Sequence, residues 1–144
     1  MIKQLTLILS FILLYSNNIF AYDVNNQCEK QLNKGKYEEA LKAANSVKNK
    51  YDSNFCKGKA NFRLRNNDQA INDFEVAEKE ASIQADQMQA ILFKGITQRD
   101  SGDFKGSSKT FTYGFQTAEL GNSKYLQYEH RFLYQLGINM LRTK

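Results

Sequence analysis

The chain has 144 residues, with 20 lysine and arginine residues against 15 acidic ones and a net charge of +5. This mildly basic balance favours acidic partners, but it lacks the clustered charge of a dedicated nucleic-acid-binding protein, so we expect no nucleic-acid partner. Proline is absent, which suits uninterrupted helices.

The N-terminal segment resembles a cleaved signal peptide. Lys3 precedes an uncharged apolar run from Leu5 to Tyr15, and a short polar stretch then leads to Ala21. The run is shorter than the roughly 20 residues that a membrane-spanning helix needs. We therefore predict a signal peptide at residues 1–21 and an exported, periplasmic protein with no stable membrane span after cleavage. Secretion and an uncleaved anchor are the alternatives.

The remaining residues, 22–144, are enough for one domain with its own core. Helical periodicity predicts hairpins at about residues 24–48, 53–80 and 83–120, followed by a helix at about 123–143. Three stretches repeat one turn-and-helix pattern: Gly35 to Leu41, Asn66 to Ile71, and Gly102 to Ser108. Small residues mark the first helices, at Cys28, Gly58 and Gly95, and the second helices carry Ala40/Ala44/Val47, Ala70/Phe74/Ala77 and Ser107/Phe111/Gly114.

This pattern resembles the tetratricopeptide repeat (TPR) family, in particular an exported, bacterial-type member. The resemblance implies an all-α fold, a short right-handed α-solenoid of about three helical hairpins with a C-terminal capping helix. It also implies a scaffold that binds other proteins without catalysis.

Two local expectations follow from the repeats. Ala40 and Ala70 are 30 residues apart and Ala70 and Ser107 are 37 apart, so we expect the difference to lie in the connecting loops. The segment after Phe104 is rich in glycine, serine and threonine, yet its repeat context predicts a helix stabilised by packing. In the last helix we expect one apolar face made of Tyr125, Tyr128, Phe132, Leu133, Leu136, Met140 and Leu141.

The family resemblance implies a concave groove lined by the first helices, which would bind an extended peptide or a helix. The residues on that face would be Glu29, Phe55, Lys59, Arg63, Phe93, Ile96, Arg99, Arg131 and Tyr134. Arginine pairs with carboxylate through two parallel bonds and aromatic rings supply buried area, so this groove would suit an acidic partner with apolar side chains. The alternative is that the arginines only solvate the helices while Phe55 and Phe93 belong to the core.

Cys28 and Cys56 are the only cysteines, and an even count in an oxidising compartment invites a disulfide. Cys56 is about 200° out of phase with the helix position that matches Cys28, because it lies two residues before Gly58. The sequence leaves two outcomes open, a bridge between stacked hairpins or two separate buried thiols.

Catalytic motifs are absent from the sequence. His130 is the single histidine and has no nucleophile signature beside it, and there is no phosphate-binding loop or zinc motif. We therefore predict no enzyme activity, cofactor or metal, and a protein-interaction scaffold in the cell envelope. The alternatives are a self-associating structural module, an accessory or assembly subunit of an envelope complex and, more weakly, a hydrolase of envelope polymers.

Overall fold

The computed structural model describes residues 27–143, apart from the side chains of residues 122 and 123. Every regular element in this range is a helix, which confirms the predicted all-α class. Residues 27–33 are helical, and the later elements are α2 (Tyr37–Ala44), α3 (Lys50–Arg63), α4 (Asn67–Glu80), α5 (Gln84–Asp100), α6 (Phe104–Glu119), the 3-10 helix η1 (Asn122–Tyr125) and α7 (Leu126–Arg142). The predicted signal peptide and the expected start of the first hairpin at residue 24 lie outside the described residues.

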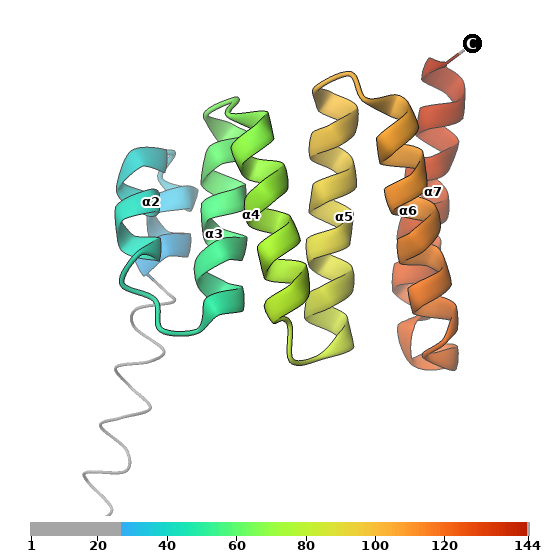
Figure 1. Cartoon of the computed structure of the whole chain (residues 1–144), viewed down its shortest axis with the longest axis horizontal. Coiled ribbons are helices and arrows are strands. Elements are labelled where there is room, and N and C mark those ends of the chain that lie inside the picture. The colour runs from blue at the N-terminus through green and yellow to red at the C-terminus, as the bar shows by residue number, and fades with distance from the viewer. Residues whose placement is uncertain (1–26, 144) are drawn as a thin grey trace, which may run out of the picture.

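The helices lie side by side in the order of the chain (Figure 1). Each helix from α2 to α7 packs mainly against its neighbours in the chain, and weaker contacts join α3 to α5 and α5 to α7. The two ends of the described chain therefore lie at opposite ends of the row. None of the helices from residue 27 to residue 143 combines the length and the apolar character needed to cross a membrane.

The three repeated stretches form one kind of turn. Gly35, Arg65 and Gly102 adopt left-handed backbone conformations, with φ of 72°, 65° and 94°. The residue after each donates its backbone N–H to the carbonyl five residues earlier, in the pairs Lys36 to Gln31, Asn66 to Asn61 and Asp103 to Gln98. This is the Schellman arrangement, which ends one helix and redirects the chain into the next.

Glycines in three helices make room for phenylalanine rings of the following helix. A Cβ atom added to Gly58 would overlap the ring of Phe74, and one added to Gly95 would overlap Phe111. Gly114 stands in the same relation to Phe132. The small residues of the predicted repeat thus have a packing role, because each notch allows a large ring to be buried between neighbouring helices.

The core is divided into three clusters along the row. The first contains only small buried side chains: Cys28, Ala40, Ala44, Cys56 and Ala60. The second is aromatic and contains Tyr51, Phe55 and Phe74. The third is the largest and contains Met88, Ile91, Leu92, Phe111, Ala118, Tyr125, Tyr128 and Phe132.

The unequal repeat spacing arises in the helices, so the expectation that it lies in the loops is wrong. Helix α2 has 8 residues and α4 has 14, while α3 has 14 and α5 has 17. The connection before α3, residues 45–49, is in fact longer than the connection before α5, residues 81–83. The chain keeps the packing register by placing the same turn at each hairpin and varying how far the helices extend beyond it.

Helix α6 forms over Phe104–Glu119 despite its glycines and hydroxyl residues, as predicted. Its start is capped by Asp103, whose carboxylate accepts the backbone N–H of Gly106 at 2.8 Å. Ser107, Phe111 and Gly114 on its inner face are buried. Packing against α5 and α7 therefore compensates for its weak intrinsic propensity.

The expected single apolar face of the last helix is wrong, because these residues fall on two sides of α7. Tyr125, Tyr128 and Phe132 are buried in the third cluster, and Leu136 packs against it. In contrast, Leu133, Met140 and Leu141 are exposed. Helix α7 thus covers the preceding helices with one face and presents a second apolar face to solvent.

Candidate functional site

A hollow of about 190 Å³ lies where residues 27–33, α2, α3 and α5 meet. Its lining residues are Glu29, Leu32, Asn33, Tyr37, Lys59, Phe62, Arg63 and Phe93. The helical register explains this gathering, because residues three and four apart share one side of a helix. Lys59, Phe62 and Arg63 follow this spacing on α3, as do Glu29, Leu32 and Asn33 on the helix of residues 27–33. The hollow is therefore built by three alternate helices, which are residues 27–33, α3 and α5, and by the start of α2.

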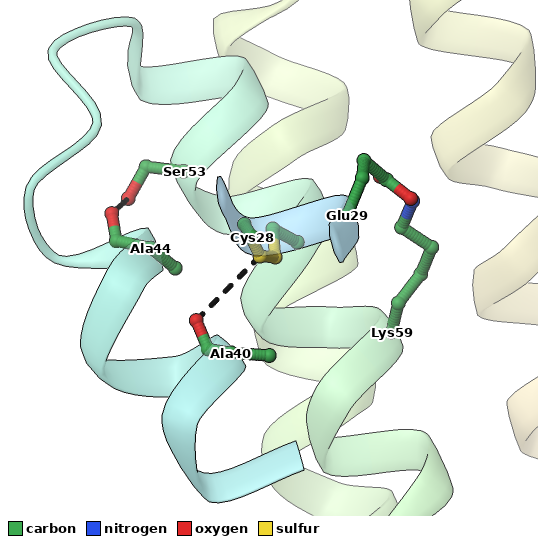
Figure 2. Close-up of a disulfide and its surroundings, with 7 residues drawn as sticks. Cys28, Glu29, Ala40, Ala44, Ser53 and Lys59 are labelled. Carbon is green, nitrogen blue, oxygen red and sulfur yellow. Dashed lines mark hydrogen bonds and ion pairs between the residues drawn. A yellow bond between two sulfur atoms is a disulfide. The ribbon is translucent and has the colours of Figure 1, made fainter. Parts of the chain in front are cut away.

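The two basic side chains of the hollow differ in whether they form an ion pair. Lys59 forms an ion pair with Glu29, and Figure 2 shows the two side chains meeting across the gap between their helices. The Lys59 ammonium also lies 5.0 Å from the centre of the Phe55 ring, within cation–π range. Arg63 is exposed and forms no ion pair with any residue in the described part of the chain.

Aromatic rings form the apolar part of the wall. Tyr37, Phe62 and Phe93 are each partly buried, so each has surface left to offer. Phe93 meets Phe55 edge to face with 5.3 Å between ring centres, and this contact fixes its orientation. The result is an exposed guanidinium beside fixed aromatic surface, which is suited to a carboxylate with a neighbouring apolar group.

A disulfide supports the hollow from behind. Cys28 and Cys56 are bonded in the structure, with their Cα atoms 6.5 Å apart (Figure 2). Cys56 and Gly58 are out of phase on α3 because the two residues face different neighbouring helices. Cys56 belongs to the cluster shared with α2, whereas Gly58 holds the ring of Phe74 on α4. Ser53 adds a second tie by donating its hydroxyl to the carbonyl of Ala44 at 2.8 Å.

Four of the nine predicted groove residues line this hollow: Glu29, Lys59, Arg63 and Phe93. Phe55 lies behind them and is only 7% exposed, because it packs in the second cluster between Tyr51, Phe74 and Phe93. It supports the wall and offers a partner almost no surface. This agrees with the alternative in which Phe55 belongs to the core.

The other four predicted residues lie elsewhere. Ile96 packs against the third cluster, and the side chain of Arg99 is 10% exposed and donates to Gln135 of α7. Arg131 is exposed over the ring of Tyr128, and Tyr134 lines a different hollow on α7. The structure thus does not gather all nine residues at one place, because Ile96 and Arg99 are covered by packing near α7 and the exposed Arg131 and Tyr134 lie on α7 itself, away from the hollow.

Four lining residues were missed by the sequence analysis: Leu32, Asn33, Tyr37 and Phe62. Leu32 and Asn33 are three and four residues after Glu29, and Phe62 is three after Lys59, so helical spacing alone could have suggested them. Tyr37 begins the second helix of its hairpin. The predicted groove included residues of first helices only, so Tyr37 was left out.

The titratable groups with perturbed pKa values lie at the start of α3 and α5. Burial, with smaller contributions from Asp86 and Asp52, raises the pKa of the Tyr51 phenol. The phenol donates a hydrogen bond to the side-chain oxygen of Gln89 at 3.3 Å. Burial and the nearby Asp52 raise the pKa of Asp86. No cluster of three or more potential metal ligands of the His, Cys, Asp or Glu type occurs within residues 27–143.

Comparison of the chain with family models, curated proteins and solved structures finds no match in any of the three.

Proposed function

We propose that the chain is a short right-handed α-solenoid of tetratricopeptide-like hairpins that acts as a non-enzymatic protein-interaction scaffold. The repeated turn at Gly35, Arg65 and Gly102 supports this assignment, as does the glycine notch that receives a phenylalanine ring in successive hairpins. Contacts between neighbouring helices dominate the packing, as expected for a repeat array.

The proposed binding site is the hollow around Arg63, and its ligand is an acidic peptide or helix with an apolar side chain. One observation carries this proposal: an exposed guanidinium without an ion pair among the described residues stands beside the partly buried rings of Phe62 and Phe93. A carboxylate can bind Arg63 through two parallel hydrogen bonds while its neighbour packs on the rings. Lys59 contributes less, because Glu29 already neutralises it.

The proposed location is the cell envelope, most simply the periplasm. The N-terminal sequence, with Lys3 before an apolar run and Ala21 at its end, supports export. The Cys28–Cys56 disulfide supports it independently, because such bonds persist in oxidising compartments. The bond also matters for binding, since Glu29, Leu32 and Asn33 belong to the helix that it ties to α3.

Site-specific photo-crosslinking in the native cell envelope tests the proposal. Benzoylphenylalanine is introduced at Asn33 or Tyr37, which line the hollow and leave Arg63 in place, and at Lys79 on the exposed side of α4 as the control. We expect a discrete product from both hollow positions and none from Lys79. Equal background from all three positions would contradict the proposed site.

The partner identified in this way allows a quantitative test with purified proteins. Hydrogen bonds to a charged group contribute about 1.5–3 kcal/mol, so Arg63→Gln is expected to weaken binding by tenfold or more. Lys79→Gln removes the same charge from the other side of the row and should leave the affinity within a factor of two. Equal losses for the two variants would indicate a general charge effect and would reject the specific role of Arg63.

A further inference from the structure

The outer face of α7 is apolar and has no neighbour within residues 27–143. Leu126, Leu133 and Met140 recur every seven residues along it, and Gly137 and Leu141 lie between and beside them. At about 100° per residue these positions share the side of the helix opposite Tyr128 and Phe132, which face the core. The large apolar side chains on this face are between 47% and 76% exposed.

Gly137 forms a notch in this face. A Cβ atom added to it would meet no other atom within 4 Å, whereas the equivalent atom on Gly58, Gly95 or Gly114 would overlap a phenylalanine ring. Tyr134, Ile138, Met140 and Leu141 surround the notch and line a hollow of about 450 Å³ with it. A phenylalanine ring like those that cover Gly58, Gly95 and Gly114 is thus missing at Gly137, whereas Gly106, in the first turn of α6, lies against the Asp103 side chain.

An aromatic ring suited to the notch is available on the same face. Tyr134 lies three residues before Gly137 and is 68% exposed. In a two-fold pair each contact occurs twice, so residue i of one copy meets residue j of the other and the reverse. An antiparallel pairing of two α7 helices about the midpoint of Tyr134 and Gly137 places each ring over the glycine of the other copy. A parallel two-fold pairing would place ring against ring and leave both notches empty.

We propose that α7 is a self-association surface on which a second copy of this chain docks antiparallel, with Tyr134 of each copy in the Gly137 notch of the other. In this register Leu133 of one copy faces Ile138 of the other, so apolar side chains flank both notches. A single pair of helices buries less than a standard interface of about 1,600 Å². The dimer is therefore expected to be weak.

Sedimentation of the full, oxidised chain from about 1 µM to about 1 mM tests the proposal. We expect the weight-average mass to rise from monomer towards dimer. Gly137→Lys should raise the Kd by tenfold or more without unfolding the chain, because the added side chain meets open space in the monomer. Tyr113→Ala, at another exposed tyrosine, is the matched control and should leave the Kd unchanged.

A swap of the two residues makes the test specific to the proposed geometry. Tyr134→Gly alone removes the ring and Gly137→Tyr alone fills the notch, so each should weaken the dimer. The double variant again pairs one ring with one glycine in the antiparallel arrangement and should restore association to within about threefold of the original. Addition of 0.5 M salt should not weaken the dimer, because the contact is apolar and each copy carries the same net charge of +5.

Three results would overturn the proposal. The first is a monomer throughout the concentration range. The second is a dimer that survives Gly137→Lys, which would place the contact elsewhere in the chain. The third is photo-crosslinking from benzoylphenylalanine at Tyr134 that captures only other proteins, with no link to residues 133–141 of a second copy.

Discussion

The two ends of the helical row are held together by different means. The first cluster consists of cysteine and alanine side chains and includes the 8-residue helix α2. The last cluster contains Phe111 and Phe132, fully buried, together with Met88, Ile91 and Leu92. The comparison teaches that a hairpin too short to bury large side chains can retain its place through a covalent bond.

The sizes of the two contributions are similar. Complete burial of one large apolar side chain stabilises a fold by about 1.5–3 kcal/mol. A disulfide that spans the 28 residues between Cys28 and Cys56 contributes about 3.5 kcal/mol in the chain-entropy model. The disulfide at one end therefore stabilises the fold by about as much as one or two buried rings do at the other end.

The largest loss is expected when a ring is removed from the C-terminal cluster. Phe111→Ala leaves a cavity over Gly95 and should lower the free energy of unfolding by about 3–5 kcal/mol in urea denaturation. Tyr113→Ala, two residues away on the exposed side of α6, should change it by no more than about 0.5 kcal/mol. Equal effects would contradict the assignment of Phe111 to the core.

Removal of the bridge should cost slightly less. The double variant Cys28→Ala and Cys56→Ala is expected to lose about 3.5 kcal/mol relative to the oxidised protein. The unreduced protein should also have an intact mass two hydrogens below that of the free-thiol form. A mass equal to that of the free-thiol form would contradict the covalent support of the first hairpin.

One substitution should have opposite effects at two glycines. Gly58→Ala forces a methyl group into the ring of Phe74 and should destabilise the protein by about 1–3 kcal/mol. Gly137→Ala places the same group in open space on α7, where higher helix propensity should stabilise the monomer by about 0.5–1 kcal/mol. Thermal unfolding at low protein concentration measures both, and changes of the same sign would refute the notch description.

An effect as small as that of Gly137→Ala is expected at the middle turn. Arg65 adopts φ of 65°, where its counterparts in the other turns are Gly35 and Gly102. Arg65→Gly relieves this left-handed strain and should stabilise the protein by about 0.5–1 kcal/mol in urea denaturation. Arg63→Gly is the control: it places glycine in the last turn of α3, a right-handed helix, and should instead destabilise it.

The sequence was sufficient for the presence and order of the helices, since apolar spacing predicted each helix and the repeated turns marked where one helix of a hairpin gives way to the next. It even predicted α6 against its poor propensity, because the positions of Ser107, Phe111 and Gly114 repeat those of α4. Helix lengths were beyond its reach, because the repeat defines the turns and leaves the far ends of the helices unconstrained. The face of α7 was misjudged because Leu133 and Phe132 are equally apolar in sequence but point in different directions.

The candidate site was only partly predictable for a related reason. Arg63 and Phe93 were found from their places on first helices, and they do line the hollow. Arg99 holds a similar place but donates to Gln135, a long-range contact that no local pattern reveals. Tyr37 joins the hollow from α2, whose approach is fixed by the disulfide and the packing of Ala40 and Ala44.

Hydrogen exchange of the oxidised and reduced protein, followed peptide by peptide, tests most directly whether the two ends are held by different means. On reduction we expect residues 27–44 to lose protection by tenfold or more, while α5, α6 and α7 keep theirs. The hollow around Arg63 should be lost together with the first hairpin. Equal loss of protection along the whole row, or no loss in residues 27–44, would contradict the account.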